Sequence, residues 1–66
     1  MQLTVNGKPS EVLDGTSLPA LVESLGLRVG SVVVEHNGTA LLRSELAGVA
    51  LHDGDRLELV RAVAGG

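Results

Sequence analysis

Residue types that commonly do chemistry are scarce in this chain of 66 residues. It has no cysteine and only two histidines, which excludes a thiol nucleophile and a disulfide and leaves too few ligands for a convincing zinc site. We expect His36 to be an exposed residue at a strand end and His52-Asp53 to be a surface pair in a turn. Asp53 and Asp55 flank Gly54 as turn residues, because the other ligands of a calcium loop are absent. We therefore expect no metal site and no autonomous catalysis.

The final residues, Ala64-Gly65-Gly66, suggest a different chemistry. Glycine averages about 7% of residues, so two adjacent glycines at this place are rare by chance. An ordinary interpretation is a frayed end, since termini are often poorly ordered. A functional interpretation is that a backbone without side chains enters a narrow slot in a partner and carries the Gly66 carboxylate to a reactive centre. A carboxylate is a poor electrophile, and adenylation would turn one of its oxygens into a leaving group.

Composition and charge narrow the possible partners. Eight acidic and five basic residues give a formal charge of −3, and aromatic residues are absent. Nucleic-acid binding favours a basic face and aromatic stacking, so no nucleic-acid partner is expected. No apolar run approaches the roughly 18 residues of a membrane span, and the first residues lack the basic region of a signal peptide. We expect a cytoplasmic protein that is monomeric on its own and has no membrane partner.

Two Asn-Gly pairs predict β-hairpins. Asn6-Gly7 and Asn37-Gly38 suit the positive φ angles of a type I′ turn. Pro9 lacks an N–H group, which favours an edge position for the strand that follows the first turn. Alternating or β-branched segments predict strands at 1–5, 10–15, 31–36, 39–42 and 56–63.

The segment between the hairpins has the period of a helix. Its apolar stripe, spaced i, i+3, i+4 and i+7, consists of Leu18, Leu21, Val22 and Leu25. Thr16 or Ser17 can cap the start of this helix. Gly26 suits the left-handed position after its end, and Leu27 is expected to contact Val22. A helix this short must pack on the sheet to be stable.

The segment 56–63 predicts a central strand, because both of its faces carry apolar residues. One face holds Leu57, Leu59, Arg61 and Val63, and the other holds Arg56, Glu58, Val60 and Ala62. The pattern leaves open which of the two faces is buried. A short helical turn with a loop is expected over 43–51.

This order of elements predicts an α+β, β-grasp-like fold. The expected sheet is mixed, with four to five strands and one helix packed across one face. Topology places the first and last strands side by side and parallel. We expect a single domain over residues 1–63 and a flexible Gly-Gly tail at 64–66.

Several segments together resemble the ThiS-type sulfur carriers of thiamine biosynthesis. In chain order they read VNGK, GTSLPALVESLGL, VVVEHNG, LHDGDRLELVRAV and AGG. This family has the β-grasp, ubiquitin-like fold. The chain departs from the family's pattern at Ala62, where many members have an aromatic residue, and at Ala64, where a third glycine is frequent. It also lacks the proline that often precedes the residue equivalent to Arg43.

The resemblance implies a carrier protein that is not itself an enzyme. An E1-like adenylyltransferase would activate the Gly66 carboxylate with ATP and Mg²⁺, and no cofactor would be bound on this chain. A sulfur donor, a cysteine desulfurase or an equivalent enzyme, would then supply the sulfur of a thiocarboxylate. Thiazole synthase would receive that sulfur. The residues expected to contact these partners are Arg61, Val63, Ala64 and Gly65.

Three other functions remain open at this point. A sulfur carrier for molybdopterin or cysteine synthesis would share the fold and the Gly-Gly end. A ubiquitin-like conjugation module would instead join Gly66 to a lysine, and in a plain binding domain the last residues would be incidental. By analogy with ubiquitin-like folds, we expect partners to dock on the sheet face without the helix, near the last strand.

Overall fold

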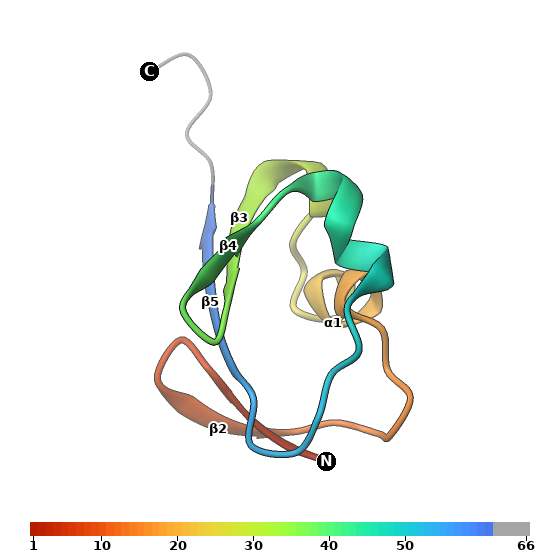
Figure 1. Cartoon of the computed structure of the whole chain (residues 1–66), viewed down its shortest axis with the longest axis vertical. Coiled ribbons are helices and arrows are strands. Elements are labelled where there is room, and N and C mark those ends of the chain that lie inside the picture. The colour runs from red at the N-terminus through yellow and green to blue at the C-terminus, as the bar shows by residue number, and fades with distance from the viewer. Residues whose placement is uncertain (62–66) are drawn as a thin grey trace.

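The computed structural model describes residues 1–61. One mixed sheet has the strand order β2-β1-β5-β3-β4, and the helices lie to one side of it (Figure 1). This is the predicted β-grasp arrangement, with five strands. The elements are β1 (Gln2–Val5), β2 (Lys8–Glu11), α1 (Leu18–Ser24), the 3-10 helix η1 (Val29–Ser31), β3 (Val32–His36), β4 (Thr39–Leu41), the 3-10 helix η2 (Arg43–Gly48) and β5 (Arg56–Arg61). None of the helices within 1–61 is long and apolar enough to cross a membrane.

Both hairpins turn at the predicted Asn-Gly pairs. The φ angles are 52° at Asn6 and 79° at Gly7, and 50° at Asn37 and 87° at Gly38, as a type I′ turn requires. Strand β2 lies at an edge of the sheet, as Pro9 predicted. The predicted bounds of 10–15 were wrong at both ends, because a two-residue turn brings the chain directly back into register with β1, so that β2 starts at residue 8 and ends at residue 11.

Strand β5 is the central strand, as predicted. It runs parallel to β1, with Thr4 opposite Arg56, and antiparallel to β3, with Val34 opposite Leu59. The described part of the strand ends at Arg61. The predicted strand positions 62 and 63, and the predicted tail at 64–66, lie outside the described residues.

Helix α1 begins and ends with the expected local chemistry. The Ser17 side chain accepts a hydrogen bond from the Ala20 N–H at 3.1 Å, so Ser17 is the N-cap. After the helix Gly26 has a φ of 78°, and the Leu27 N–H donates to the Val22 carbonyl at 3.3 Å. The prediction that Leu25 belongs to the buried stripe was wrong, since Leu25 is 48% exposed. The helix ends one residue before it, so its side chain leaves the stripe.

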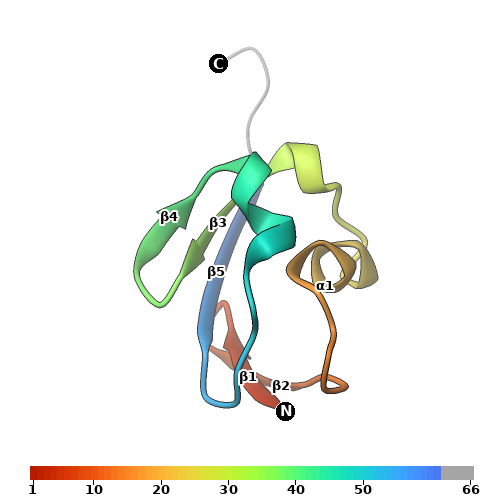
Figure 2. The same ribbon diagram turned by 45° about the vertical axis from the view of Figure 1, so that its right-hand side comes forward.

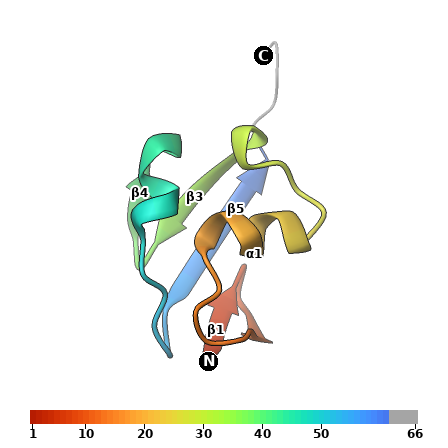
Figure 3. The ribbon, with the colours of Figure 1, turned by 90° about the vertical axis from the view of Figure 1, so that its right-hand side faces the viewer.

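The core is made of aliphatic side chains between the sheet and the helices. Within 1–61 its buried members are Leu3, Val5, Leu18, Leu21, Val22, Val34, Leu46, Leu57 and Leu59. Figures 2 and 3 show α1 and η2 on the same side of the sheet, where η2 contributes the buried Leu46. Leu57 and Leu59 point to this side, which settles the question that the sequence left open. The opposite side of β5 carries Arg56, Glu58 and Val60.

Candidate functional site

The face of the sheet opposite α1 is the surface on which docking was expected. Within the described chain it carries no helix, and alternate side chains of its two central strands are exposed. We call it the open face, and define it by Val33 and Glu35 from β3 and Arg56, Glu58 and Val60 from β5. Successive side chains of a strand point to opposite faces of the sheet, so the residues of β3 and β5 that do not face the core lie on the open face.

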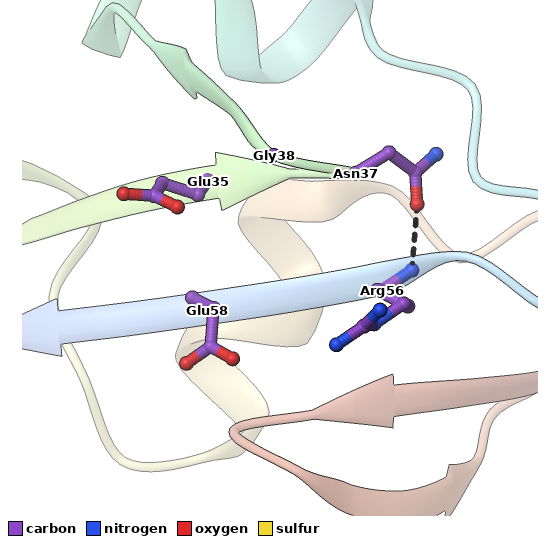
Figure 4. Close-up of a pocket in the computed structure, with 5 residues that line it drawn as sticks. All are labelled: Glu35, Asn37, Gly38, Arg56 and Glu58. Carbon is purple, nitrogen blue, oxygen red and sulfur yellow. Dashed lines mark hydrogen bonds between the residues drawn. The ribbon is translucent and has the colours of Figure 1, made fainter.

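Two carboxylates meet in the middle of the open face. Glu35 lies directly opposite Glu58 in the antiparallel β3–β5 pair, and both are exposed. Figure 4 shows them on adjacent strands beside Arg56, in a surface pocket that Asn37 and Gly38 also line. Among residues 1–61 no ion pair joins Arg56 to either carboxylate. Like charges directly opposite each other weaken a strand pair, so a cationic group of a partner would stabilise this arrangement.

An apolar pair adjoins the carboxylates. Val33 lies opposite Val60, two residues beyond Glu58 along β5, and these side chains are 49% and 61% exposed. Leu42, directly after β4, is 69% exposed. Adjacent apolar side chains next to charged ones are typical of a contact surface, whereas isolated exposed apolar residues need no explanation.

A polar network joins the second hairpin to the loop before β5. The Asp55 carboxylate contacts the His36 Nε2 atom at 2.8 Å and accepts from the Asn37 amide at 3.1 Å and the His52 backbone N–H at 2.9 Å. Burial on its own raises the pKa of Asp55, but these hydrogen bonds outweigh it and lower the pKa to about 2. The expectation for His36 was therefore wrong in part, because its side chain is held by Asp55 and is only 21% exposed.

The two turn asparagines also hold β5 in place. The Asn37 side-chain oxygen accepts from the Arg56 N–H at 2.9 Å, the dashed contact in Figure 4. In the same way, the Asn6 side-chain oxygen accepts from the Leu59 N–H at 2.7 Å. The sequence indicated both residues only as turn formers, since a cross-strand bond depends on which strands become neighbours. These hydrogen bonds stabilise the position of β5. The residues that make them do not form a pair of nucleophile and general base.

The turn at 52–55 has the predicted surface character. His52 and Asp53 are both exposed, and the Asp53 carboxylate accepts from the Gln2 backbone N–H at 2.6 Å. Within the part of the chain that is described, no three potential ligands lie close enough together to hold a metal ion.

Of the residues predicted to contact partners, the structure describes Arg61. It is exposed at the end of β5, opposite Val32 and adjacent in sequence to Val60 of the open face. The other predicted site residues, Val63, Ala64, Gly65 and Gly66, lie outside the described residues. The open face and Arg61 thus share the end of β5.

Two solved structures from one bacterium are similar to this chain. The chain is 38% identical to the thiamine biosynthesis protein ThiS of Geobacter metallireducens in its crystal structure, with a TM-score of 0.81 and all of both chains covered. An NMR structure of a thiamine biosynthesis protein from that organism gives 36% identity and a TM-score of 0.78, over 100% of this chain and 88% of the other.

Curated relatives are longer proteins. The chain is 36% identical over its whole length to a thiazole synthase of Paramagnetospirillum magneticum, and 33% identical to one of Magnetococcus marinus. In both comparisons the chain spans only 20% of the relative's length. The model of the ThiS family matches residues 3–66, which is nearly the entire sequence. The chain therefore belongs to the ThiS family.

Proposed function

We propose that this chain is a sulfur carrier in thiamine biosynthesis and serves as a protein substrate for partner enzymes. The family match over residues 3–66 carries the proposal, since it includes the Gly-Gly pair together with the fold. The proposed partners are an E1-like adenylyltransferase, a sulfur donor such as a cysteine desulfurase, and thiazole synthase. The similarity to thiazole synthases of two bacteria supports the last of these.

The proposed chemistry takes place on the Gly66 carboxyl group. A carboxylate oxygen attacks the α-phosphorus of ATP and releases pyrophosphate, which gives an acyl-adenylate. The terminal sulfur of a persulfide on the donor then attacks the acyl carbon, and AMP leaves with the original oxygen. A second thiol attacks the donor sulfur of the new S–S bond, which leaves a disulfide between that thiol and the donor and releases the thiocarboxylate. The resulting thiocarboxylate differs from the starting carboxylate by one exchange of oxygen for sulfur. Gly65 and Ala64 keep the approach narrow, since glycine has no side chain and alanine only a methyl group.

The open face is proposed as the surface that docks on the adenylyltransferase. Its apolar pair, Val33 and Val60, offers area that water leaves on binding, and its carboxylates Glu35 and Glu58 offer charge for a basic group. Val60 is adjacent in sequence to Arg61, the last described residue of β5, so an enzyme on this face would contact the strand that leads to Gly66.

Reconstitution with intact-mass analysis tests the proposal. The purified chain is incubated with an adenylyltransferase of this type, ATP, Mg²⁺ and a sulfur source. We expect a species heavier by one O-to-S exchange, dependent on ATP and absent when Gly66 is deleted. A mass that stays unchanged while a known ThiS-family protein is converted would contradict the proposal.

The same experiment separates the competing functions. An adduct through an isopeptide bond to a lysine would indicate a conjugation module. The chain could also be loaded with sulfur that another acceptor enzyme consumes and thiazole synthase does not. That result would indicate a sulfur carrier for a pathway other than thiamine biosynthesis. Because the curated relatives are longer, the mass of the protein from cells also shows whether it ends at Gly66 there.

A further inference from the structure

Three of the five basic side chains of this protein gather at the end of the molecule where β5 reaches its last described residue. Arg28 and Arg61 line the same surface pocket, and Val32, between η1 and the rest of β3, pairs with Arg61. Arg43 reaches the same place from η2, because its guanidinium carbon lies 3.2 Å from the position a Cβ atom would take on Gly30 of η1. We call Arg28, Arg43 and Arg61 the arginine rim.

The arginine rim carries positive charge that the described part of the protein leaves unpaired. All three side chains are exposed, and the ion pairs within residues 1–61 involve none of them. The acidic group nearest in sequence to Arg43 is Glu45 of η2, whose carboxylate accepts from the Leu42 N–H at 2.6 Å. At the other end of the sheet Asp14 contacts the Met1 amino group at 3.0 Å. Figure 3 shows these two ends far apart along the sheet, with η1 beside the end of β5 and η2 next to β4. A chain with a net charge of −3 thus presents a basic end.

We propose that the arginine rim docks on carboxylates surrounding the entrance through which the adenylyltransferase admits the last residues of the chain. This inference rests on the proposed function, because an enzyme that acts on Gly66 has to approach this end. Guanidinium groups bind carboxylates with two parallel hydrogen bonds, which gives orientation as well as affinity. Complementary charge around an entrance also steers encounter and raises the association rate.

A protein surface fits the arginine rim better than the phosphates of a nucleotide. The three arginines come from separate elements, namely the loop before η1, the start of η2 and the end of β5. We commit to a protein surface because an enzyme that acts on Gly66 has to meet this end of the chain, and binding to the nucleotide is an outcome that the test separates. The exposed Val33–Val60 pair continues this surface onto the open face.

Charge reversal with a matched control tests the inference. ATP–pyrophosphate exchange by the adenylyltransferase is measured for Arg28→Glu, Arg43→Glu and Arg61→Glu, and for Lys8→Glu. Lys8 is exposed in the first hairpin, outside the open face residues and the arginine rim, so its variant makes the same charge change elsewhere. Thermal unfolding by circular dichroism shows whether all four variants keep the fold.

Each arginine variant is expected to raise the KM for the chain by about threefold to tenfold at low salt, with kcat retained. Lys8→Glu should remain close to the unsubstituted protein. The difference should shrink in about 1 M salt, where the Debye length is only about 3 Å. Arg28→Lys should recover part of the loss, because it restores charge without the planar group.

Three results would overturn the inference. If the arginine variants have the same KM as Lys8→Glu while the unsubstituted chain is adenylated, the rim has no docking role and the proposed function stands. A higher KM for ATP with an unchanged KM for the chain would assign the arginines to the nucleotide. If an adenylyltransferase that is active on a known ThiS-family protein shows no exchange with the unsubstituted chain, the proposed function itself fails, and the rim's role with it.

Discussion

The two faces of the same sheet are built from alternate residues of the same strands, and they have different roles. On the covered face of β5, Leu57 and Leu59 are 1% and 7% exposed and pack against α1. On the open face, Glu58 lies between these two leucines in sequence and Val60 follows them, and both side chains are exposed. Glu58 lies opposite the carboxylate of Glu35. The covered face removes apolar area from water, while the open face retains apolar and charged groups that the folded chain does not use.

This difference indicates where stability and function are separable. A domain of this size buries only about 60% of the surface of its unfolded chain, so each core side chain matters. The open face keeps a like-charge pair and two exposed valines that bring no evident stability. We interpret these features as retained for contact with partners, and substitutions on the two faces test that separation.

The largest effect is expected at a core position of β5. Leu57→Ala should lower the free energy of unfolding by about 2–5 kcal/mol, because it leaves a cavity beside α1. Total stabilities of small domains are about 5–15 kcal/mol, so this variant would lose a large share of the free energy of unfolding. Urea unfolding followed by far-UV circular dichroism measures it, since the chain has no aromatic residue to report by fluorescence.

Val60→Ala is the control three residues away on the open face. Its unfolding free energy should stay within about 0.5 kcal/mol of the unsubstituted protein. Equal losses for Leu57→Ala and Val60→Ala would contradict the assignment of the two faces.

Acid should weaken the hydrogen bonds that Asp55 makes at the start of β5. The folded pKa of Asp55, about 2, lies below its ordinary value of 3.8, so the charged carboxylate stabilises the fold above about pH 4. This contribution, on the order of 2 kcal/mol, is lost as the pH falls from about 4 to 2. Asp55→Asn should therefore flatten the dependence of the unfolding free energy on pH in this range.

Asp53→Asn is the matched control for the acid experiment, since it removes the same charge from the same turn. We expect it to retain the steep loss of stability between about pH 4 and pH 2. If Asp55→Asn and the unsubstituted protein lose stability in parallel, the hydrogen bonds from His36 and Asn37 do not hold Asp55 in its charged form.

A smaller effect is expected on partner binding. Val60→Ser should weaken the complex with the adenylyltransferase by about 1 kcal/mol, because apolar area at the contact is lost. Titration calorimetry measures the affinity, and circular dichroism checks that the fold is kept. An unchanged affinity would remove the open face from the docking surface.

The smallest effect concerns the paired carboxylates. Glu58→Gln removes the charge opposite Glu35 and should raise the free energy of unfolding by a few tenths of a kcal/mol. The same variant should bind the adenylyltransferase less tightly if a basic group of that enzyme meets the pair. A variant that is less stable, with unchanged binding, would indicate that Glu58 has a structural role instead.

Much of the fold could be predicted from local patterns. The Asn-Gly pairs fixed both hairpins because few residues accept positive φ at both turn positions. Pro9 placed β2 at an edge, and the spacing of Leu18, Leu21 and Val22 predicted the buried side of α1. These features depend on neighbours in sequence, which the sequence displays directly.

Other features depend on contacts between distant segments, and patterns could not supply them. Which side of β5 is buried is decided by where α1 lies, because both sides carry apolar residues. The bond from His36 to Asp55 joins residues 19 positions apart, and it forms only because β3 and β5 are neighbours. The gathering of Arg28, Arg43 and Arg61 has the same origin. Arg61 was predicted from the sequence as a contact residue, and the other two were not.

The intact mass of the protein purified from cells that are making thiamine shows whether it carries sulfur there. For a sulfur carrier we expect a fraction of molecules heavier by one O-to-S exchange, with fragmentation placing the exchange on Gly66. Deleting Gly66 should abolish this species and leave thermal unfolding unchanged. Only the unmodified mass, under conditions in which a known ThiS-family protein carries sulfur, would contradict the account.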